Sequence, residues 1–398
     1  MKNKFILVIN CGSSSIKFSL IDPATGNERL NGLAQSLMTE QATITFKVDG
    51  NKEKQSLTSP FDHQIALRSI VDFLTQHSYK EAVFAVGHRV VHGGEEYSEP
   101  ALIDNNVMAT LHRLSQLAPL HNPANITGIE ASEKAFPSLP QVAVFDTAFH
   151  QSMPKKAYLY ALPYALYEQH GIRRYGFHGT SHYFVSRAAS QLLNLPALKG
   201  SFISAHLGNG SSICAIENGL SVDTSMGLTP LSGIVMGTRS GDIDPGIIFH
   251  LINSLGYTQK QVNDLLNKES GLLGLSQLSN DCRLLEEAML AGNEQAKLAL
   301  DIFCYRIAKQ IAAYAASLST LDAIIFTGGI GENSDYVRAQ VTQSLSLLNI
   351  TIDNELNVAT RFGKSGNIAA NESRACLVIP TNEEWVIAKQ TAQVINAI

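Results

Sequence analysis

The chain has 398 residues, of which 45% are hydrophobic and 16% charged, and its 30 Lys and Arg against 35 Asp and Glu give a formal net charge of −5. This balance argues against a nucleic-acid or anionic-membrane surface as the main partner, and it excludes intrinsic disorder. The length predicts two domains, or three, each large enough for its own core.

The cysteine pattern indicates a reducing compartment, and the hydrophobicity pattern argues against secretion and membrane insertion. The five cysteines form no Cys-x-x-Cys pair and leave an odd number, so neither a disulfide framework nor a zinc knuckle is predicted. The apolar run at 5–9 is shorter than the roughly 7–15 residues of a secretory segment. No stretch approaches the ~18 uninterrupted apolar residues of a membrane helix. We therefore expect a soluble, cytoplasmic protein.

Two strand-turn-strand patterns of the same polarity open the two halves of the chain. In the first, apolar runs at 5–9 and 16–21 flank a polar turn at 10–15. In the second, runs at 202–205 and 213–216 flank a turn at 206–212. Gly-Ser-Ser at 12–14 recurs at 210–212, about half a chain later. The repeat predicts a duplicated domain.

Strands and helices alternate in the rest of both halves, which predicts α/β domains. Further strands are expected at 83–86, 141–145, 323–326 and 375–379, and helices at 64–76, 182–193, 284–318 and 334–347. No linker rich in Pro, Gly or Ser separates the halves. We therefore expect the domains to meet across a hinged cleft, where ligands often bind.

Glycine-rich turns after apolar strands are the most informative feature. Successive N–H groups in the turns at 208–212 and 327–333 can form anion-binding nests. Either turn alone could simply join strands, but together with 10–15 they favour a nucleotide. A P-loop is excluded because Val358 replaces its first glycine, and a dinucleotide fingerprint because Ser334 replaces its third. Repeated phosphate hairpins resemble the actin-like ATPase fold.

Arg89 and Arg239 stand on glycine-containing loops and suit a transferring phosphoryl group, because a guanidinium binds its oxygens bidentately. The alternative for each is a surface ion pair. His178 and His182 are four residues apart, but Gly179 stands where a metalloprotease has glutamate, so we discount a zinc pair. His178 is a candidate charge stabiliser, and a packing histidine is its alternative.

Lys17 and three acidic residues complete the candidates. Lys17 ends a Ser-x-x-Lys sequence, but the turn leads into a strand rather than a helix, so we interpret it as a phosphate-facing ammonium or a solvated edge lysine. Asp146 follows a strand, and Glu383 and Glu384 follow another, which suits Mg²⁺ bound to carboxylates and phosphate. A helix N-cap and a solvated helix start are their respective alternatives.

Taken together, these motifs make the chain similar to the acetate and propionate kinase family of the actin-like ATPase superfamily. The matching segments are 10–18, 87–94, 118–123, 144–150, 174–182, 206–210, 223–230, 236–242, 326–333 and 380–384. They extend over most of the chain, and several are long enough to exclude coincidence.

The resemblance implies an α/β fold of duplicated actin-like ATPase (ribonuclease H-like) domains flanking a cleft, with 1–149 plus 384–398 as the N-terminal domain and 150–383 as the nucleotide-binding domain. It implies reversible phosphoryl transfer between ATP and acetate, giving acetyl phosphate and ADP, with Mg²⁺, or Mn²⁺ as an alternative ion, in a homodimer. A propionate kinase of the same family is the nearest alternative. An actin-like ATPase with a structural or chaperone role is the alternative from another class.

The resemblance also implies a role for each matching residue. Arg89, Arg239, His178 and Asp146 would be catalytic, although a carboxylate substrate needs no base, and we interpret Asp146 as orienting Arg89 or a magnesium-bound water. The acetate pocket would comprise Arg89, Val91, Leu120, His121, Phe177 and Pro230. The nucleotide and its phosphates would contact Lys17, His206, Leu207, Gly208, Asn209, Gly210, Asp281, Cys282, Arg283, Gly329, Ile330, Gly331, Glu332 and Asn333. Asn10 and Glu383 would hold the metal.

Overall fold

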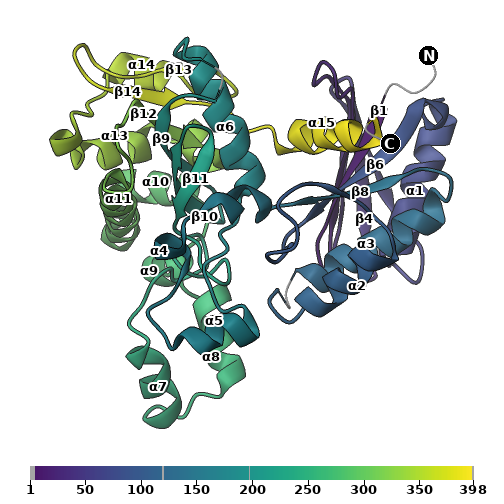
Figure 1. Ribbon diagram of the computed structural model, residues 1–398, viewed down its shortest axis with the longest axis horizontal. Coiled ribbons are helices and arrows are strands. Elements are labelled where there is room, and N and C mark those ends of the chain that lie inside the picture. The colour runs from purple at the N-terminus through teal and green to yellow at the C-terminus, as the bar shows by residue number, and fades with distance from the viewer. Residues whose placement is uncertain (1–4, 119–120, 197, 397–398) are drawn as a thin grey trace. The chain divides into compact units, whose positions relative to one another are not determined.

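The two strand-turn-strand repeats form the centres of two separate β-sheets (Figure 1). The computed structural model describes residues 5–118, 121–196 and 198–396. Contacts divide the chain into unit 1, Met1–Ala148 with Asn382–Ile398, and unit 2, Phe149–Thr381.

Unit 1 is built on an eight-stranded sheet in the order β5-β4-β3-β2-β1-β6-β8-β7. Its strands are β1 (Phe5–Cys11), β2 (Ile16–Ile21), β3 (Glu28–Gln35), β4 (Thr43–Val48), β5 (Asn51–Ser56), β6 (Val83–Val90), β7 (Ala101–Leu102) and β8 (Gln141–Phe145). Its helices are α1 (His63–Gln76), α2 (Asn105–Leu114), α3 (Asn122–Ala135) and α15 (Glu383–Asn396), with a 3₁₀ turn at Lys80–Ala82.

Unit 2 is built on a six-stranded sheet in the order β11-β10-β9-β12-β14-β13. Its strands are β9 (Ser201–Leu207), β10 (Ser211–Glu217), β11 (Leu220–Thr224), β12 (Ala323–Thr327), β13 (Gly366–Asn367) and β14 (Ala375–Val378). Its helices are α4 (Lys155–Tyr158), α5 (Tyr164–His170), α6 (Gly179–Leu192), α7 (Gly246–Asn253), α8 (Gln259–Lys268), α9 (Gly271–Ser276), α10 (Cys282–Leu290), α11 (Glu294–Ala315), α12 (Gly328–Asn333), α13 (Asp335–Gln343) and α14 (Asn354–Ala359). The remaining 3₁₀ turns are Ala148–Ser152 and Ser346–Leu348.

The same five-stranded pattern lies inside both sheets. In unit 1, β1 pairs antiparallel with β2, β2 pairs antiparallel with β3, and β6 and β8 continue the sheet in parallel on the other side of β1. In unit 2, β9, β10, β11, β12 and β14 repeat these pairings in the same order and directions. The repeat predicted from the sequence is therefore a repeat of topology.

Helices cover both faces of each sheet, because the buried strands carry apolar residues on both sides. In unit 1, Leu7 and Ile9 pack toward α1 and α3, whereas Ile6 and Val8 pack toward α15. In unit 2, one face packs against α9, α10, α11 and α13, and the opposite face packs against α6. Each unit is thus a three-layer α/β/α arrangement.

Gly87 in the middle of β6 lets α15 approach the sheet closely. A Cβ atom at this position would lie 2.4 Å from Thr391 Oγ1 and 2.9 Å from Ile387 Cγ2, both on α15. Any larger residue would push the helix away or force it to repack. Gly87 therefore lets α15, whose first turn carries Glu383 and Glu384, lie close to the strand that carries Arg89.

Two predicted elements differ from the structure for local reasons. The helix expected at 284–318 is two helices, α10 and α11, because Gly292 adopts a φ of 90° between them. The turn expected at 327–333 contains the short helix α12, which begins at Gly328 with a φ of 75°. Among the described residues, no helix combines the length and the apolar content needed to cross a lipid bilayer.

Candidate active site

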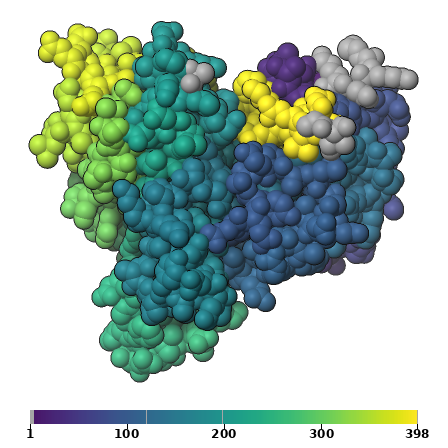
Figure 2. Space-filling view, viewed as in Figure 1, coloured from purple at the N-terminus to yellow at the C-terminus, as the bar shows by residue number. Residues whose placement is uncertain are grey.

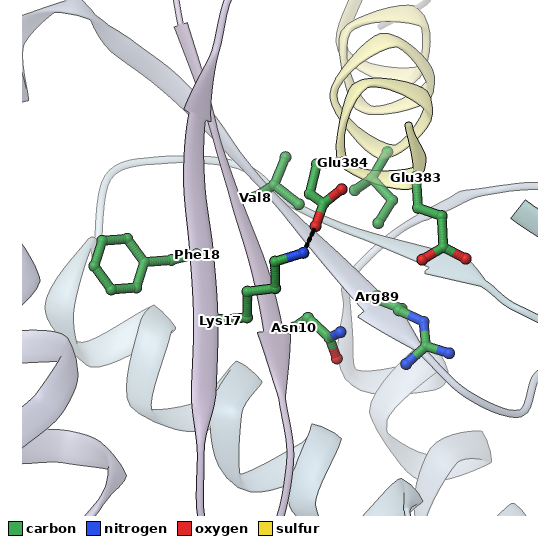
Figure 3. A pocket seen from close by; sticks show the side chains of 8 residues that line it. Val8, Asn10, Lys17, Phe18, Arg89, Glu383 and Glu384 are labelled. Carbon is green, nitrogen blue, oxygen red and sulfur yellow. Dashed lines mark hydrogen bonds and ion pairs between the residues drawn. The ribbon is translucent and has the colours of Figure 1, made fainter. Parts of the chain in front are cut away.

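Polar side chains of unit 1 gather where β1, β2 and β6 meet α15 (Figure 3). Asn10 lies directly opposite Lys17 in the β1–β2 ladder, and Arg89 follows His88, the β6 partner of Ile9. Because side chains alternate along a strand, these three residues project from the face that α15 covers. They line one small pocket together with Glu383 and Glu384.

The Arg89 guanidinium is paired with Asp146, which directly follows β8. The Nη2 of Arg89 lies 2.9 Å from Oδ2 of Asp146, whose side chain is 1% exposed. Burial alone would lower the pKa of Arg89, but the charges of Asp146 and Glu383 raise it above its ordinary value. Arg89 is therefore a fixed cation, and Asp146 holds its orientation.

Glu383 is a buried carboxylate beside this pair. Its Oε1 is buried and accepts no hydrogen bond from the described residues. Burial raises the pKa of Glu383 to about 7, and the Arg89 charge opposes this shift. The neighbouring Glu384 is instead paired with Lys17. Glu383 thus has an oxygen that is available to a cation.

The loop after β6 is held in place by a buried asparagine of α3. Asn125 accepts a hydrogen bond from the Val91 N–H at 3.0 Å and donates one to the Cys11 carbonyl at 2.8 Å. This side chain links the loop with Val91 to the end of β1. His121 lies just before α3 and is partly buried, whereas Leu120 is outside the described residues.

In unit 2, His178 and Arg239 meet around Gly210. A Cβ atom at Gly210 would lie 3.3 Å from His178 Nε2 and 3.6 Å from Arg239 Nη1. The absence of a side chain at Gly210 keeps the space between these two groups open. Phe177, the residue before His178, is 2% exposed.

Arg239 is a half-buried cation without an acidic partner among the described residues. Its Nη1 donates a hydrogen bond to the Pro230 carbonyl at 3.1 Å and contacts the Met236 sulfur at 3.8 Å. No carboxylate in the described part of the chain forms an ion pair with it. Burial lowers the pKa of Arg239, yet a guanidinium stays charged at neutral pH. Such a charge favours an anionic ligand.

A pocket of about 750 Å³ lies beside these residues in unit 2 and is large enough for a nucleotide. The predicted nucleotide-binding residues that line it are Gly208, Asn209, Asp281, Cys282, Arg283, Gly329, Ile330 and Asn333. Three separate loops therefore converge on one pocket. Asn280 donates to Asn209 Oδ1 at 3.0 Å, which ties two of them together.

Other predicted nucleotide residues do not line this pocket. Leu207 is fully buried, and the carboxylate of Glu332 accepts hydrogen bonds from the N–H groups of Gly328 and Thr381. His206 is hydrogen-bonded through Nδ1 to Ser181 at 2.8 Å. The Gly331 carbonyl accepts from Arg338 at 2.9 Å. These groups are instead hydrogen-bonded or buried within unit 2.

Comparison with known proteins gives the context for this geometry. A sequence model of the acetokinase family matches residues 5–389. The chain belongs to the acetokinase family. It is 54% identical over 398 residues to an acetate kinase of Shewanella putrefaciens, with 100% of both chains covered. A propionate kinase from Francisella tularensis subsp. tularensis has a TM-score of 0.94 at 44% identity, covering 98% of this chain and 100% of that one. A Porphyromonas gingivalis acetate kinase has a TM-score of 0.93 at 42% identity, with the same coverage.

Membership of the acetokinase family confirms the predicted fold class of duplicated actin-like domains and the predicted enzyme class, a phosphotransferase that uses ATP and ADP.

The pocket in unit 2 is also lined by residues that the sequence did not single out. Among them are Glu286, Leu290, Arg361 and Phe362. Phe362 directly precedes the Gly-Lys-Ser sequence at 363–365, which lacks the first glycine of a P-loop. The structure leaves Phe362 79% exposed, whereas the sequence shows only an aromatic residue among polar and glycine residues.

Proposed function

We propose that this chain catalyses reversible phosphoryl transfer between ATP and acetate, giving acetyl phosphate and ADP. The observation that carries the proposal is Arg239, a half-buried cation with no acidic partner among the described residues, beside His178 Nε2 at the open Gly210 position. A transferring phosphoryl group carries its charge on three equatorial oxygens. Fixed donors that face these oxygens stabilise the transition state.

Unit 2 supplies the groups for the phosphoryl group and the nucleotide. His178 and Arg239 would donate hydrogen bonds to the equatorial oxygens, and the pocket near Asn209 and Asn333 would hold ATP. Phe177 and Pro230 would contribute to the apolar wall around the substrate methyl group. No proton has to leave acetate, since it is already ionised at neutral pH, so the reaction depends on positioning and charge.

Unit 1 supplies the groups for the carboxylate and the phosphates. Arg89, oriented by its ion pair with Asp146, would bind acetate, and Val91 and His121 would lie beside it. Asp146 would therefore act through Arg89 and not as a base. Lys17 would interact with phosphate in exchange for its present partner, Glu384.

The chemistry of the donor set in unit 1 fits Mg²⁺. The buried Oε1 of Glu383 has no hydrogen-bond partner among the described residues, and Asn10 offers an amide oxygen at the same pocket. Mg²⁺ is usually held by only one or two carboxylates together with phosphate oxygens and water. Glu383 and Asn10 would hold the ion, with Mn²⁺ as an alternative. When bound, it would neutralise charge on the nucleotide phosphates.

The choice of acetate over propionate depends on one methylene group, which an apolar pocket discriminates by only about 1–3 kcal/mol. We propose acetate because Phe177 is bulky and buried, and at the proposed site it would narrow this pocket. We expect kcat/KM to fall in the order acetate, propionate, butyrate with Mg-ATP. A higher kcat/KM for propionate would overturn the assignment to acetate but not the acyl-kinase activity.

We also propose a homodimer, because α7 is strongly apolar yet has no buried residue. Phe249 on α7 is 64% exposed, and Leu255, just after the helix, is 58% exposed. The helix belongs to a projecting lobe of unit 2 (Figure 2). Exposed apolar surface of this kind usually marks an interface. Sedimentation equilibrium should give twice the chain mass, and Phe249→Asp should shift the mass to that of one chain. Leu347→Asp, at a fully exposed site on another element, should remain dimeric. A monomeric wild type would refute the dimer.

We place the protein in the cytoplasm. All five cysteines are free and buried, as a reducing compartment maintains them. ATP is also available there as the phosphoryl donor.

A further inference from the structure

The ring of His178 is fixed from the side opposite its proposed ligand. The residue has a φ of 56°, a left-handed conformation that costs free energy in a non-glycine residue and is maintained by its surroundings. Its ring stacks on His206 with a centroid distance of 4.3 Å. Its Nδ1 lies 3.0 Å from Ser212 Oγ, whereas Nε2 faces the open position at Gly210.

Ser212 connects His178 to a second histidine in the core. Ser212 Oγ also lies 2.7 Å from His182 Nε2, and His182 Nδ1 lies 3.0 Å from Ser204 Oγ. Ser204, Ser212 and His182 are all fully buried. These contacts form one chain of hydrogen-bonding groups, the serine–histidine relay, which consists of Ser204, His182 and Ser212 and ends at His178.

Burial, with smaller contributions from His150 and His206, lowers the pKa of His182 well below its ordinary value, so this ring is neutral. A neutral imidazole has one N–H donor and one acceptor nitrogen, and a serine hydroxyl donates one hydrogen bond. Both ring nitrogens of His182 are occupied by serine hydroxyls. The relay therefore has two complementary arrangements, in which all of its donors point toward His178 or all point away from it.

We propose that Ser212 and His182 are positioning residues that keep a proton on Nε2 of His178, the atom that faces the transferring phosphoryl group. In the first arrangement, Ser212 donates to Nδ1, so neutral His178 carries its proton on Nε2. In the second, Ser212 accepts from Nδ1 of His178, and Nε2 then carries a proton only when the ring is cationic. Phosphoryl oxygens only accept hydrogen bonds, so we assign the first arrangement to the neutral ring.

The relay also accounts for the spacing of His178 and His182, which suggested a metal pair from sequence alone. Both nitrogens of His182 are already hydrogen-bonded within unit 2, and the described residues contain no group of three or more His, Cys, Asp or Glu that could hold a metal. The i, i+4 spacing instead puts His182 in the first turn of α6, where its Nε2 contacts the same Ser212 hydroxyl as His178. His182 thus contacts His178 through Ser212 and binds no metal in this interpretation.

This inference rests on the proposed function, and a double-mutant cycle separates the two. We expect Ser212→Ala to lower kcat about 10–100-fold, as partners that orient active-site groups typically do, with KM values for ATP and acetate within twofold. In a His178→Ala background the same substitution should change kcat less than twofold, because its effect passes through His178. Ser186→Ala removes another buried hydroxyl, on α6, that donates only to a backbone carbonyl, and should leave kcat unchanged.

Nitrogen-15 NMR of the histidine side chains tests the relay without any turnover. In the wild type, His178 should show a protonated Nε2, and Ser212→Ala should remove this preference. If Ser212→Ala misfolds, Ser204→Ala tests the far end of the relay by the same nitrogen signals. The relay would be overturned if Ser212→Ala lowered kcat equally in the His178→Ala background. It would also be overturned if Ser212→Ala left the tautomer of His178 unchanged. Near-normal turnover of His178→Ala would instead overturn the proposed role of His178.

Discussion

Arg239→Ala is expected to lower kcat by at least ~10³-fold, comparable to the loss of other cationic groups that stabilise phosphoryl transfer. The guanidinium has no carboxylate partner among the described residues, so its charge is available to the phosphoryl group. Lysine cannot reproduce its planar fork, and Arg239→Lys should recover only part of the lost activity. Trapping of acetyl phosphate with hydroxylamine measures the rate.

Folding of this variant should be unimpaired, because the substitution removes a half-buried charge that has no counter-ion in the described part of the chain. Arg187→Ala is the matched control. Arg187 is also half-buried in unit 2, but it lies over the Tyr183 ring, 3.4 Å from the centroid, and has no proposed role in the reaction. Near-normal turnover of Arg239→Ala, or an equal loss in Arg187→Ala, would refute the role of Arg239.

The second large effect is expected for Glu383→Gln, which should reduce Mg-dependent kcat at least ~10²-fold. The substitution keeps the shape of the side chain but removes the negative charge that a divalent cation requires. Raising the Mg²⁺ concentration should recover part of the activity if the metal site is weakened. Glu133→Gln, on the exposed surface of α3, should retain full activity.

The same variant gives a pH test that is independent of the metal. The pKa of Glu383 is about 7 in the folded chain, compared with an ordinary value of 4.5. The unfolded chain therefore loses this proton first, and the free energy of unfolding of the wild type falls as pH rises from about 4.5 to 7. Above about pH 7, the carboxyl group is ionised in both states, and the free energy of unfolding falls no further because of this group.

Glutamine cannot ionise, so the free energy of unfolding of Glu383→Gln should not fall in this way as pH rises. In EDTA, the stability of the variant relative to the wild type should increase by about 2 kcal/mol between pH 5 and pH 8. Urea unfolding at the two pH values measures this difference. A stability difference that does not change with pH would show that Glu383 is ionised in the folded chain without cost.

Much of the fold could be predicted because its central strands are short apolar runs bounded by glycine-rich turns. β2 and β8 have the bounds that were expected, and the hairpin repeat indicated the duplication. β5 could not be predicted, because all of its residues are exposed and it has no apolar alternation. It forms by pairing with β4, a contact that the local sequence does not encode.

Candidate residues could be selected from sequence where an arginine suited to binding phosphoryl oxygens lies on a glycine-containing loop, as for Arg89 and Arg239. The Arg89–Asp146 ion pair was one of two hypotheses for Asp146, and the structure contains this pair. Ser212 and Asn125 could not be assigned a role, because their partners come from other strands and helices through sheet register. The catalytic assignments themselves remain predictions that the variants above would test.

The central claim is that ATP turnover requires a small carboxylate as acceptor. The most direct measurement follows ADP and hydroxylamine-trapped acyl phosphate together, with and without acetate, at saturating Mg-ATP. The account predicts equimolar ADP and acetyl phosphate with acetate, and negligible ADP without it. ADP formation at the same rate in the absence of any carboxylate would contradict the account and indicate an actin-like ATPase of another kind.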